Sequence, residues 1–221
     1  MRVLLGEGDD LRAAYAAPDR PWLRVNMVST VDGAATGDDR TSRSINNQAD
    51  HEVFDLLREL ADAVVVGAGT VRSERYALGR KPLVVVSRSA GVPETQRGAA
   101  PGAVLMATVS TAEHLQEARD LLGDDHVLVL GSHRVNLARM KDELVLRGFR
   151  HLLCEGGPHL LRDLLDQGVA DEIDTTIVPR VVGGPHTRIT DGPPVDVPLH
   201  LHTLLESDGT LLARWWVGEG D

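Results

Sequence analysis

Two glycine turns, each directly after an apolar run, could bring the backbone of this 221-residue chain close to a ligand. The first is GAGT at residues 67–70, after AVVV, and the second is EGGP at residues 155–158, after LLC. Glycine allows close backbone approach, and the N-terminus of a following helix favours a phosphate. Pro158 suits the first position of such a helix. Each turn alone is also a common strand-to-helix connection, but together they predict binding of a dinucleotide pyrophosphate.

A third segment, VVVSRS, ends an apolar run at Ser87 and Arg88, about twenty residues after the first turn. In dinucleotide sites an acid at the comparable place binds the ribose hydroxyl, whereas an arginine suits a 2′-phosphate. This pattern favours NADPH as the cofactor. The alternative is that Arg88 is a solvated loop residue.

A fourth segment carries Asn26 inside an apolar strand and Asp32-Gly33 just after it. A buried amide needs hydrogen-bond partners, so Asn26 is a candidate ligand-binding residue, although a neighbouring loop could equally satisfy it. Asp32 beside a glycine is by default a turn residue.

The elements that must position these residues alternate along the chain. Short apolar runs predict strands, and periodic apolar faces predict helices between them. Val-rich strands without alternation indicate a sheet covered on both faces with parallel connections. The predicted strands are 23–28, 63–66, 83–86, 103–107, 127–130 and 151–154, followed by an alternating strand at 171–179, and the predicted helices are 53–61, 112–122 capped by Thr111, 135–146 and 159–166.

The C-terminal segments read differently. Residues 199–206 and 210–217 flank Ser207-Asp208-Gly209, which predicts an antiparallel hairpin. We therefore expect an α/β fold with a mostly parallel central sheet and antiparallel C-terminal strands. Residues 1–21 are expected to be an N-terminal extension, residues 22–221 one domain, and residues 90–102 an exposed loop.

Composition narrows the function. A formal net charge of −10 argues against a nucleic-acid partner. No apolar run approaches the roughly 18 residues of a membrane span, so we expect a soluble, cytoplasmic protein without a membrane partner. The single cysteine, Cys154, lies in an apolar run and predicts a buried thiol. Without a second thiol, and with histidines scattered, no metal site is predicted.

From Trp22 onward these segments resemble the reductase domain of the bifunctional riboflavin-biosynthesis deaminase–reductase and its stand-alone relatives. The resemblance rests on VSTVDGAAT (28–36), LRELADAVVVGAGTVR (57–72), EGGPHLL (155–161) and VADEIDTTIVPRVVGG (169–184). The preamble LRAAYAAPDRPWLR (11–24) is similar to the actinobacterial stand-alone group, and Asn26 matches the stand-alone type. No H-x-E or P-C-x-x-C deaminase signature is present.

The resemblance implies a dihydrofolate-reductase-like three-layer sandwich that forms a homodimer and binds NADPH. It implies hydride transfer to the ribosyl C1′ of 5-amino-6-(5-phosphoribosylamino)uracil. Its cofactor positions fall on Gly67, Gly69, Thr70, Val71, Ser87, Arg88, Gly156 and Gly157. Its substrate side falls on Asn26, Asn46, His51 and Glu74, with Asp32 and Glu155 as the candidate catalytic acids.

One segment departs from the family pattern. Where the family reads S-x-W-I-T, this chain has SRSIN at 42–46, and His51 stands where an arginine helps to bind the substrate phosphate. Both changes fall on the substrate side. Two alternatives therefore stay open: a reductase for another pteridine or pyrimidine such as dihydrofolate, and a non-catalytic nucleotide-binding relative.

Overall fold

The computed structural model describes residues 1–6 and 10–219. Its strands are β1 (Arg2–Leu5), β2 (Trp22–Thr30), β3 (Ala63–Gly67), β4 (Leu83–Val86), β5 (Val104–Thr108), β6 (Val127–Val129), β7 (His151–Cys154), β8 (Glu172–Val178), β9 (Leu199–Ser207) and β10 (Thr210–Val217). Its α-helices are α1 (Leu11–Ala14), α2 (Gln48–Leu60), α3 (Ala68–Ser73), α4 (Leu115–Leu122), α5 (Leu137–Leu146) and α6 (Pro158–Asp166). Short 3₁₀ helices are η1 (Ser42–Ser44), η2 (Glu94–Gln96) and η3 (Asp124–His126).

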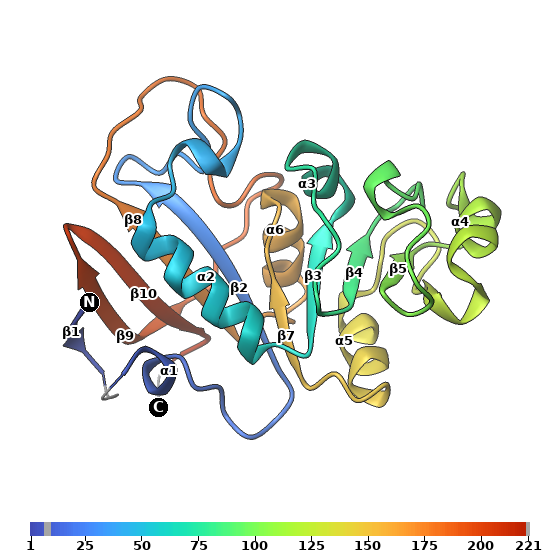
Figure 1. Cartoon of the computed structure of the whole chain (residues 1–221), viewed down its shortest axis with the longest axis horizontal. Helices are drawn as coiled ribbons and strands as arrows, with labels where there is room; N and C mark the ends of the chain where they lie inside the picture. Colours follow the sequence, from blue (N-terminus) through green and yellow to red (C-terminus); the bar gives the residue numbers. More distant parts are fainter. Residues whose placement is uncertain (7–9, 220–221) are drawn as a thin grey trace.

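These strands form one sheet in the order β1-β9-β10-β8-β2-β7-β3-β4-β5-β6 (Figure 1). The pairs from β8 through β2 and β7 to β6 are parallel, whereas β8, β10, β9 and β1 pair antiparallel. The mostly parallel sheet with antiparallel C-terminal strands is therefore confirmed. Thr210 pairs with Ser207 across the hairpin turn, as its Asp-Gly sequence predicts.

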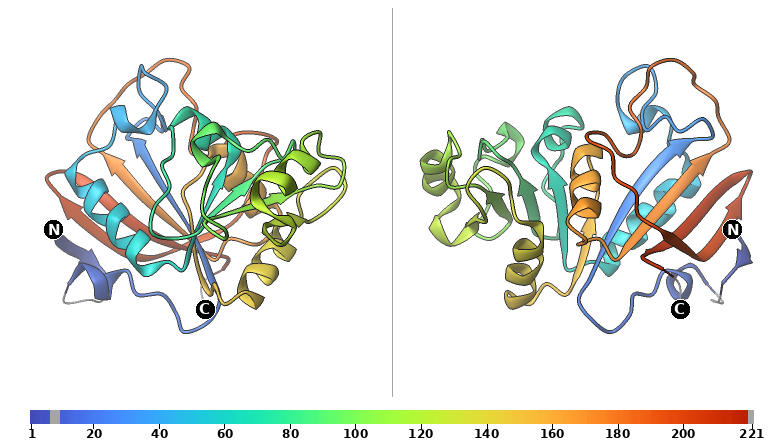
Figure 2. Two further views of the ribbon diagram at one scale, coloured as in Figure 1. Left: turned by 45° about the vertical axis from the view of Figure 1, so that its right-hand side comes forward. Right: turned by 180° about the vertical axis from the view of Figure 1, so that it is seen from behind.

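Helices cover both faces of this sheet, which gives three layers (Figures 1 and 2). Alternate residues of each strand point to opposite faces. Val65 packs in a core cluster with residues of α5 and α6, whereas Val64 packs in a cluster with residues of α3 and α4. Helix α2 buries Val53 and Leu57 on the α3 side of the sheet, against Leu153 of β7.

Two local predictions need correction. Helix α4 begins at Leu115 and not at residue 112, and the Thr111 hydroxyl donates to the Ser132 carbonyl (2.5 Å) instead of capping a helix. The 90–102 segment is only partly exposed. Val92 packs in a core cluster, and buried Gln96 donates to the Tyr76 carbonyl (2.7 Å), since a buried amide must find a partner.

The N-terminal segment joins the same sheet. Strand β1 pairs antiparallel with β9, with Arg2 opposite Glu206. Tyr15, just after α1, is 1% exposed and packs in the cluster that also holds Leu57. Within the described residues, no helix has the length and apolar character needed to cross a bilayer.

Candidate active site

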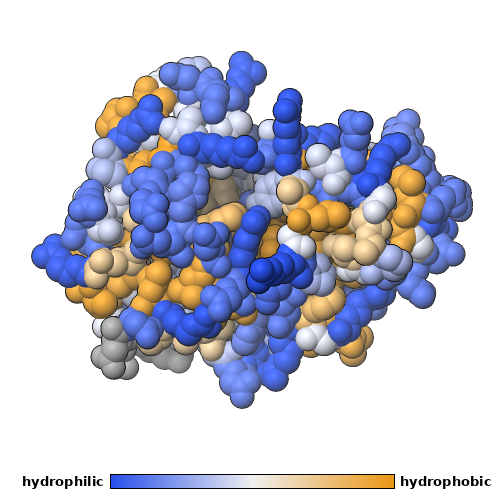
Figure 3. Space-filling model, viewed as in Figure 1, coloured by the Kyte–Doolittle hydropathy of each residue, from blue (hydrophilic) through white to orange (hydrophobic). Residues whose placement is uncertain are grey.

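A cavity of about 560 Å³ opens where β2 and the turn after β7 meet α2 and the end of α3. Figure 3 shows a hollow on this face with hydrophilic residues around its mouth. The residues of the predicted site that line the cavity are Asn26, Asn46, His51, Thr70, Glu74, Glu155 and Gly157. The structure thus brings together all four predicted substrate-side residues, both glycine-turn segments and one predicted catalytic acid.

The two glycine turns lie side by side because β3 and β7 are neighbouring parallel strands. The Gly67 N–H donates to the Gly156 carbonyl (2.9 Å). Each turn then opens a helix: α3 begins at Ala68 and α6 begins at Pro158, the predicted first position. We call these two turns, residues 67–70 and 156–158, the glycine wall of the cavity.

Two glycines of the glycine wall leave no room for a side chain. A Cβ added at Gly157 would lie 2.5 Å from the Thr70 hydroxyl oxygen, and one at Gly156 would lie 3.1 Å from the Met27 sulfur. Gly156 also has φ +85°, which disfavours other residues. At Gly69 an added Cβ would meet no atom within 4 Å. This backbone, with the N-terminus of α6, fits the pyrophosphate of a nicotinamide cofactor.

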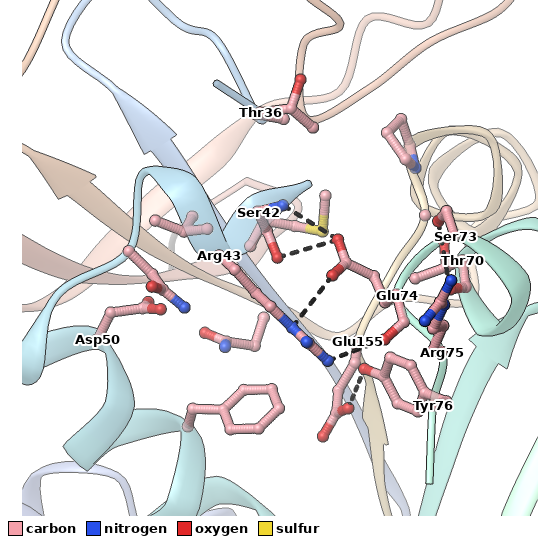
Figure 4. A pocket seen from close by; sticks show the side chains of 18 of the residues that line it. Thr36, Ser42, Arg43, Asp50, Thr70, Ser73, Glu74, Arg75, Tyr76 and Glu155 are labelled. Atoms are coloured by element: carbon pink, nitrogen blue, oxygen red, sulfur yellow. Dashed lines mark hydrogen bonds and ion pairs between the residues drawn. The ribbon is translucent and has the colours of Figure 1, made fainter. Parts of the chain in front are cut away.

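Both carboxylate oxygens of Glu155 accept hydrogen bonds on the cavity wall. Its side chain is 2% exposed and accepts both ends of the Arg58 guanidinium, from Nε (2.6 Å) and from the terminal nitrogen (2.7 Å). The Tyr76 hydroxyl donates to the same carboxylate (Figure 4). Burial raises the pKa of Tyr76 well above its usual value, and the Glu155 charge adds to that shift. Burial alone would lower the pKa of Arg58, but the Glu155 contacts outweigh it and raise that pKa.

Glu74 ties the end of α3 to η1. Its carboxylate accepts the Ser42 N–H (3.0 Å), and Arg43 lies 3.7 Å from its other oxygen. Arg43 also donates to the Glu74 carbonyl (2.8 Å), as Figure 4 shows. The altered SRSIN segment therefore keeps a defined connection to the α3 side of the cavity.

Asn26 and Asp50 present polar atoms without partners. They are 8% and 5% exposed, yet the described residues offer no hydrogen bond to Oδ1 of either side chain. Burial raises the pKa of Asp50, although a hydrogen bond from Thr176 and the neighbouring His51 lower it in part. We call Asn26, Asn46, Asp50 and His51 the polar wall of the cavity.

Cationic side chains surround the mouth of the cavity. Arg40, Arg43, Arg75 and exposed His51 all line it. Among the described residues, neither Arg40 nor Arg75 forms an ion pair, whereas Arg43 pairs with Glu74. Anionic groups such as a phosphate are favoured beside several such cations.

Other predicted site residues do not line the cavity. Asp32 is exposed, and its carboxylate accepts the Thr30 hydroxyl (2.5 Å) and the Gly183 N–H (2.7 Å). These bonds, Thr30 first, lower the pKa of Asp32 to about 2, so it holds no proton near neutral pH. The Val71 side chain is fully buried in a core cluster, so only its backbone could meet a ligand.

At the end of β4, Ser87 is buried and Arg88 is exposed. No described residue forms an ion pair with Arg88. Cys154 is a buried free thiol, as predicted, and burial raises its pKa to about 12. No three His, Cys, Asp or Glu side chains of the described residues gather as a metal site.

A buried charge cluster lies on the strands beside the polar wall. Arg214 donates from Nε to Glu172 (2.8 Å), and Arg24 lies 3.6 Å from the same carboxylate. Burial alone would raise the pKa of Glu172, but these arginines lower it to about 2. Asp174 has two buried oxygens without hydrogen-bond partners, so burial raises its pKa well above the usual value. In the β2–β8 register Asp174 lies opposite Asn26.

Sequence reasoning missed Asp50, Arg58 and Tyr76. Asp50 and Arg58 occur on an ordinary amphipathic helix, and Tyr76 in an irregular segment. Only the spacing of Asp50 and Arg58, eight residues apart and hence near one helix face, could have signalled a shared surface.

An α/β sheet with side-by-side glycine turns at its strand ends, next to a polar cavity, is typical of proteins that bind a nucleotide. The profile of the RibD C-terminal domain matches residues 21–211, so the chain belongs to that family. It is accordingly an oxidoreductase of the riboflavin-biosynthesis type, and the resemblance seen in the sequence is confirmed.

Relatives and solved structures agree with this family. The chain is 31% identical to the 2,5-diamino-6-ribosylamino-4(3H)-pyrimidinone 5′-phosphate reductase of Archaeoglobus fulgidus over 75% of its length and 83% of that protein. It is also 31% identical to the Methanothermobacter thermautotrophicus reductase of the same name, over 80% and 87%. A pyrimidine reductase-like protein from Corynebacterium diphtheriae shares the fold, with TM-score 0.77, 23% identity and coverage of 90% and 93%.

Proposed function

We propose that this protein is an NADPH-dependent reductase of the ribosyl group of a 5-amino-6-ribosylaminopyrimidine 5′-phosphate. The observation that carries the proposal is that one cavity joins the polar wall, with Asn26, Asn46 and His51, to the glycine wall, with Thr70 and Gly157. When bound, NADPH supplies the hydride that reduces C1′ of the ribosyl group. The chain itself orients the two molecules, which is the main requirement of hydride transfer.

The glycine wall would hold the cofactor. Gly67, Gly69 and Thr70, with the backbone of Val71, form one turn, and Gly156 with Gly157 forms the other. Arg88, which is exposed at the end of β4, is proposed to bind the 2′-phosphate together with Ser87. An arginine fork suits a phosphate through charge-assisted bonds.

The substrate would lie against the polar wall. Asn26 and Asn46 are proposed to bind its polar groups, and Arg40, His51 and Arg75 its phosphate. Glu74 and Glu155 can accept hydrogen bonds from ribosyl hydroxyls. Both Glu155 oxygens already accept hydrogen bonds from Arg58 or Tyr76. We therefore propose that Glu155 orients the sugar and is not the proton donor.

Asp32 is a candidate catalytic acid only because of the family pattern in the sequence. Its carboxylate accepts the Val182 and Gly183 N–H groups, so its contacts support a role in ordering the 180–184 segment next to the cavity.

Two pyrimidines are candidates for the substrate. The family pattern in the sequence implies 5-amino-6-(5-phosphoribosylamino)uracil, and the archaeal relatives are named for the form that carries an amino group on C2 of the ring. The two forms differ in presenting an acceptor or a donor at that position. The specificity must therefore come from a hydrogen-bond partner in the cavity.

The test is turnover with purified protein. NADPH or NADH is mixed with each pyrimidine phosphate and the reduced cofactor is followed by its absorbance. We expect consumption of NADPH, faster with one pyrimidine than the other, and no turnover with dihydrofolate. Absence of turnover with both pyrimidines would overturn the proposal, and turnover of dihydrofolate would replace it with the alternative.

The assembly and location are part of the same proposal: a cytoplasmic homodimer with no nucleic-acid or membrane partner. Its support is the edge strand β1, whose Val3, Leu4 and Leu5 are 44–45% exposed and together present an apolar surface. Such exposed edge strands are usually covered or paired. Sedimentation of the purified chain gives the mass, and a monomer at micromolar concentration would contradict the homodimer.

A further inference from the structure

Asp50 occupies an unusual place for a carboxylate. As the third residue of α2 it stands where acids commonly favour the helix dipole, and Asn47 caps its N–H (3.1 Å). Such residues are normally exposed, but Asp50 is 5% exposed and still borders the cavity. Figure 4 shows it across the cavity from Glu74.

The carboxylate of Asp50 has fewer partners than its burial requires. The Thr176 hydroxyl bonds it, but no described residue donates to its buried Oδ1. An ionised carboxylate with a buried, unpartnered oxygen is costly, and the group relieves that cost by keeping a proton. Glu155, on the same cavity, shows the opposite solution with three bonds from Arg58 and Tyr76.

Asn26 adds a second open polar atom at this end of the cavity. Its Oδ1 is buried without a partner, and its neighbour in the β2–β8 register is Asp174, whose carboxylate lies 3.9 Å from Nε of both Arg24 and Arg214. Val28 lies two residues after Asn26 on the same face of β2, and it pairs with Thr176 of β8. The Thr176 hydroxyl forms a hydrogen bond with Asp50. The polar wall therefore ends in two buried oxygen atoms, Oδ1 of Asn26 and Oδ1 of Asp50, to which no described residue donates a hydrogen bond.

We propose that Asp50 is the catalytic acid of the reduction and that Asn26 positions the group which accepts its proton. This inference rests on the proposed function. Reduction of the ring-opened imine forms a C1′–H bond from the hydride and an N–H bond from a proton, while the C1′–N π bond breaks. NADPH is oxidised to NADP⁺ and the imine carbon is reduced. Asp50 gives up its proton, becomes a carboxylate, and regains a proton from solvent.

The charged groups around Asp50 set its pH response. His51 follows it on α2, Asp174 lies on β8 behind Asn26, and Arg58 lies two turns further along α2 facing Glu155. Protonated His51 favours the carboxylate form, and burial opposes it. The proton is present below the raised pKa of Asp50 and lost above it, so kcat falls as pH rises through that value.

The experiment compares Asp50→Asn with Asp55→Asn. Asp55 lies on the same helix but is exposed and outside the cavity, so it is a matched control for removing one charge from α2. We expect kcat of Asp50→Asn to fall by about 10²- to 10⁴-fold, the usual contribution of a general acid, with KM little changed. Asp55→Asn should match the unaltered protein.

A second readout does not depend on turnover. Infrared difference spectra between the unaltered protein and Asp50→Asn, recorded from acid to neutral pH, should contain the carbonyl stretch of a protonated carboxyl group above the pH range of an ordinary aspartate. The Asp55→Asn difference spectrum should lack that band in the same range.

The outcomes separate the two proposals. A kcat within about threefold of the unaltered value overturns the Asp50 assignment, as does an Asp50 carboxyl that ionises in the pH range of an ordinary aspartate. A lower melting temperature with unchanged kcat would make Asp50 a structural helix residue, which also overturns it. If the unaltered protein turns over neither pyrimidine, the proposed function fails, while the infrared result still reports whether Asp50 holds a proton.

Discussion

The glycine wall and the polar wall face the same cavity but are built in opposite ways. The glycine wall is mostly backbone, and at Gly157 a side chain would collide with the Thr70 hydroxyl. The polar wall is made of side chains, and in two of them, Asn26 and Asp50, the Oδ1 atom is buried without a hydrogen-bond partner among the described residues. A backbone surface suits a cofactor that must only be held, whereas open polar side chains suit a substrate that must react.

The largest expected effect comes from filling the glycine wall. Replacing Gly157 with Val puts side-chain atoms where the Thr70 hydroxyl and a pyrophosphate would lie. We expect NADPH affinity to fall by more than about 100-fold, or ~2.7 kcal/mol, measured by fluorescence titration. Gly69→Ala, whose Cβ meets nothing nearby, should unfold at the same temperature as the unaltered protein. Retained affinity in Gly157→Val with an intact circular dichroism spectrum would reduce the glycine wall to a tight turn.

The next largest effect concerns Arg88 and the preference for NADPH over NADH. An arginine–phosphate contact contributes roughly 1.5–3 kcal/mol, or about ten- to a hundredfold in affinity. Changing Arg88 to Ala should remove most of the preference for NADPH over NADH, with NADH binding unchanged. Equal binding of both cofactors to the unaltered protein would contradict the role of Arg88.

These walls also differ in how far the sequence predicts them. The glycine wall comes from two short local motifs, each joined to a strand that is recognisable by itself, so its place at the strand ends could be predicted. The polar wall combines β2, η1 and α2 with β8 behind them, and only the register of Asn26 with Asp174 brings these residues together. Helical spacing places Asp50 near the face of Val53 and Leu57, but its position beside the cavity is a property of the assembled fold.

The same reason explains the errors at α4 and residues 90–102. A threonine before an apolar run is a typical N-cap, but Thr111 bonds Ser132 across the fold. The polar sequence of 90–102 predicted a loop, yet Val92 packs in a core cluster, a contact invisible in its own sequence.

A smaller effect tests the rim of the polar wall. If His51 helps to hold the substrate phosphate, His51→Ala should raise the substrate KM severalfold, because a hydrogen-bond donor at the cavity is lost, with the KM for NADPH changing less. His51→Arg, which keeps a donor at this place, should restore a low substrate KM. An unchanged KM in His51→Ala would assign the phosphate to Arg40 and Arg75 alone.

The smallest effect concerns Asp32. Its folded pKa of about 2 lies below the unfolded value of ~3.9, so it stabilises the native state above pH 4 and loses that contribution as pH falls towards 2. Asp32→Asn should therefore lower the melting temperature slightly at pH 6 and hardly at pH 2. Differential scanning calorimetry measures both. A larger loss at the acidic pH would show that the Thr30 and Gly183 bonds do not favour the ionised carboxylate.

The most direct test compares two of the carboxylates that line the cavity, Asp50 and Glu155. Steady-state kcat and substrate KM are measured for Asp50→Asn and Glu155→Gln. If Asp50 is the catalytic acid, Asp50→Asn lowers kcat at nearly constant KM, because proton transfer from Asp50 stabilises only the transition state. Glu155→Gln should mainly raise KM, because the carboxylate held by Arg58 and Tyr76 orients the sugar. A large loss of kcat in Glu155→Gln, with kcat unchanged in Asp50→Asn, would contradict the assignment of Asp50 as the catalytic acid.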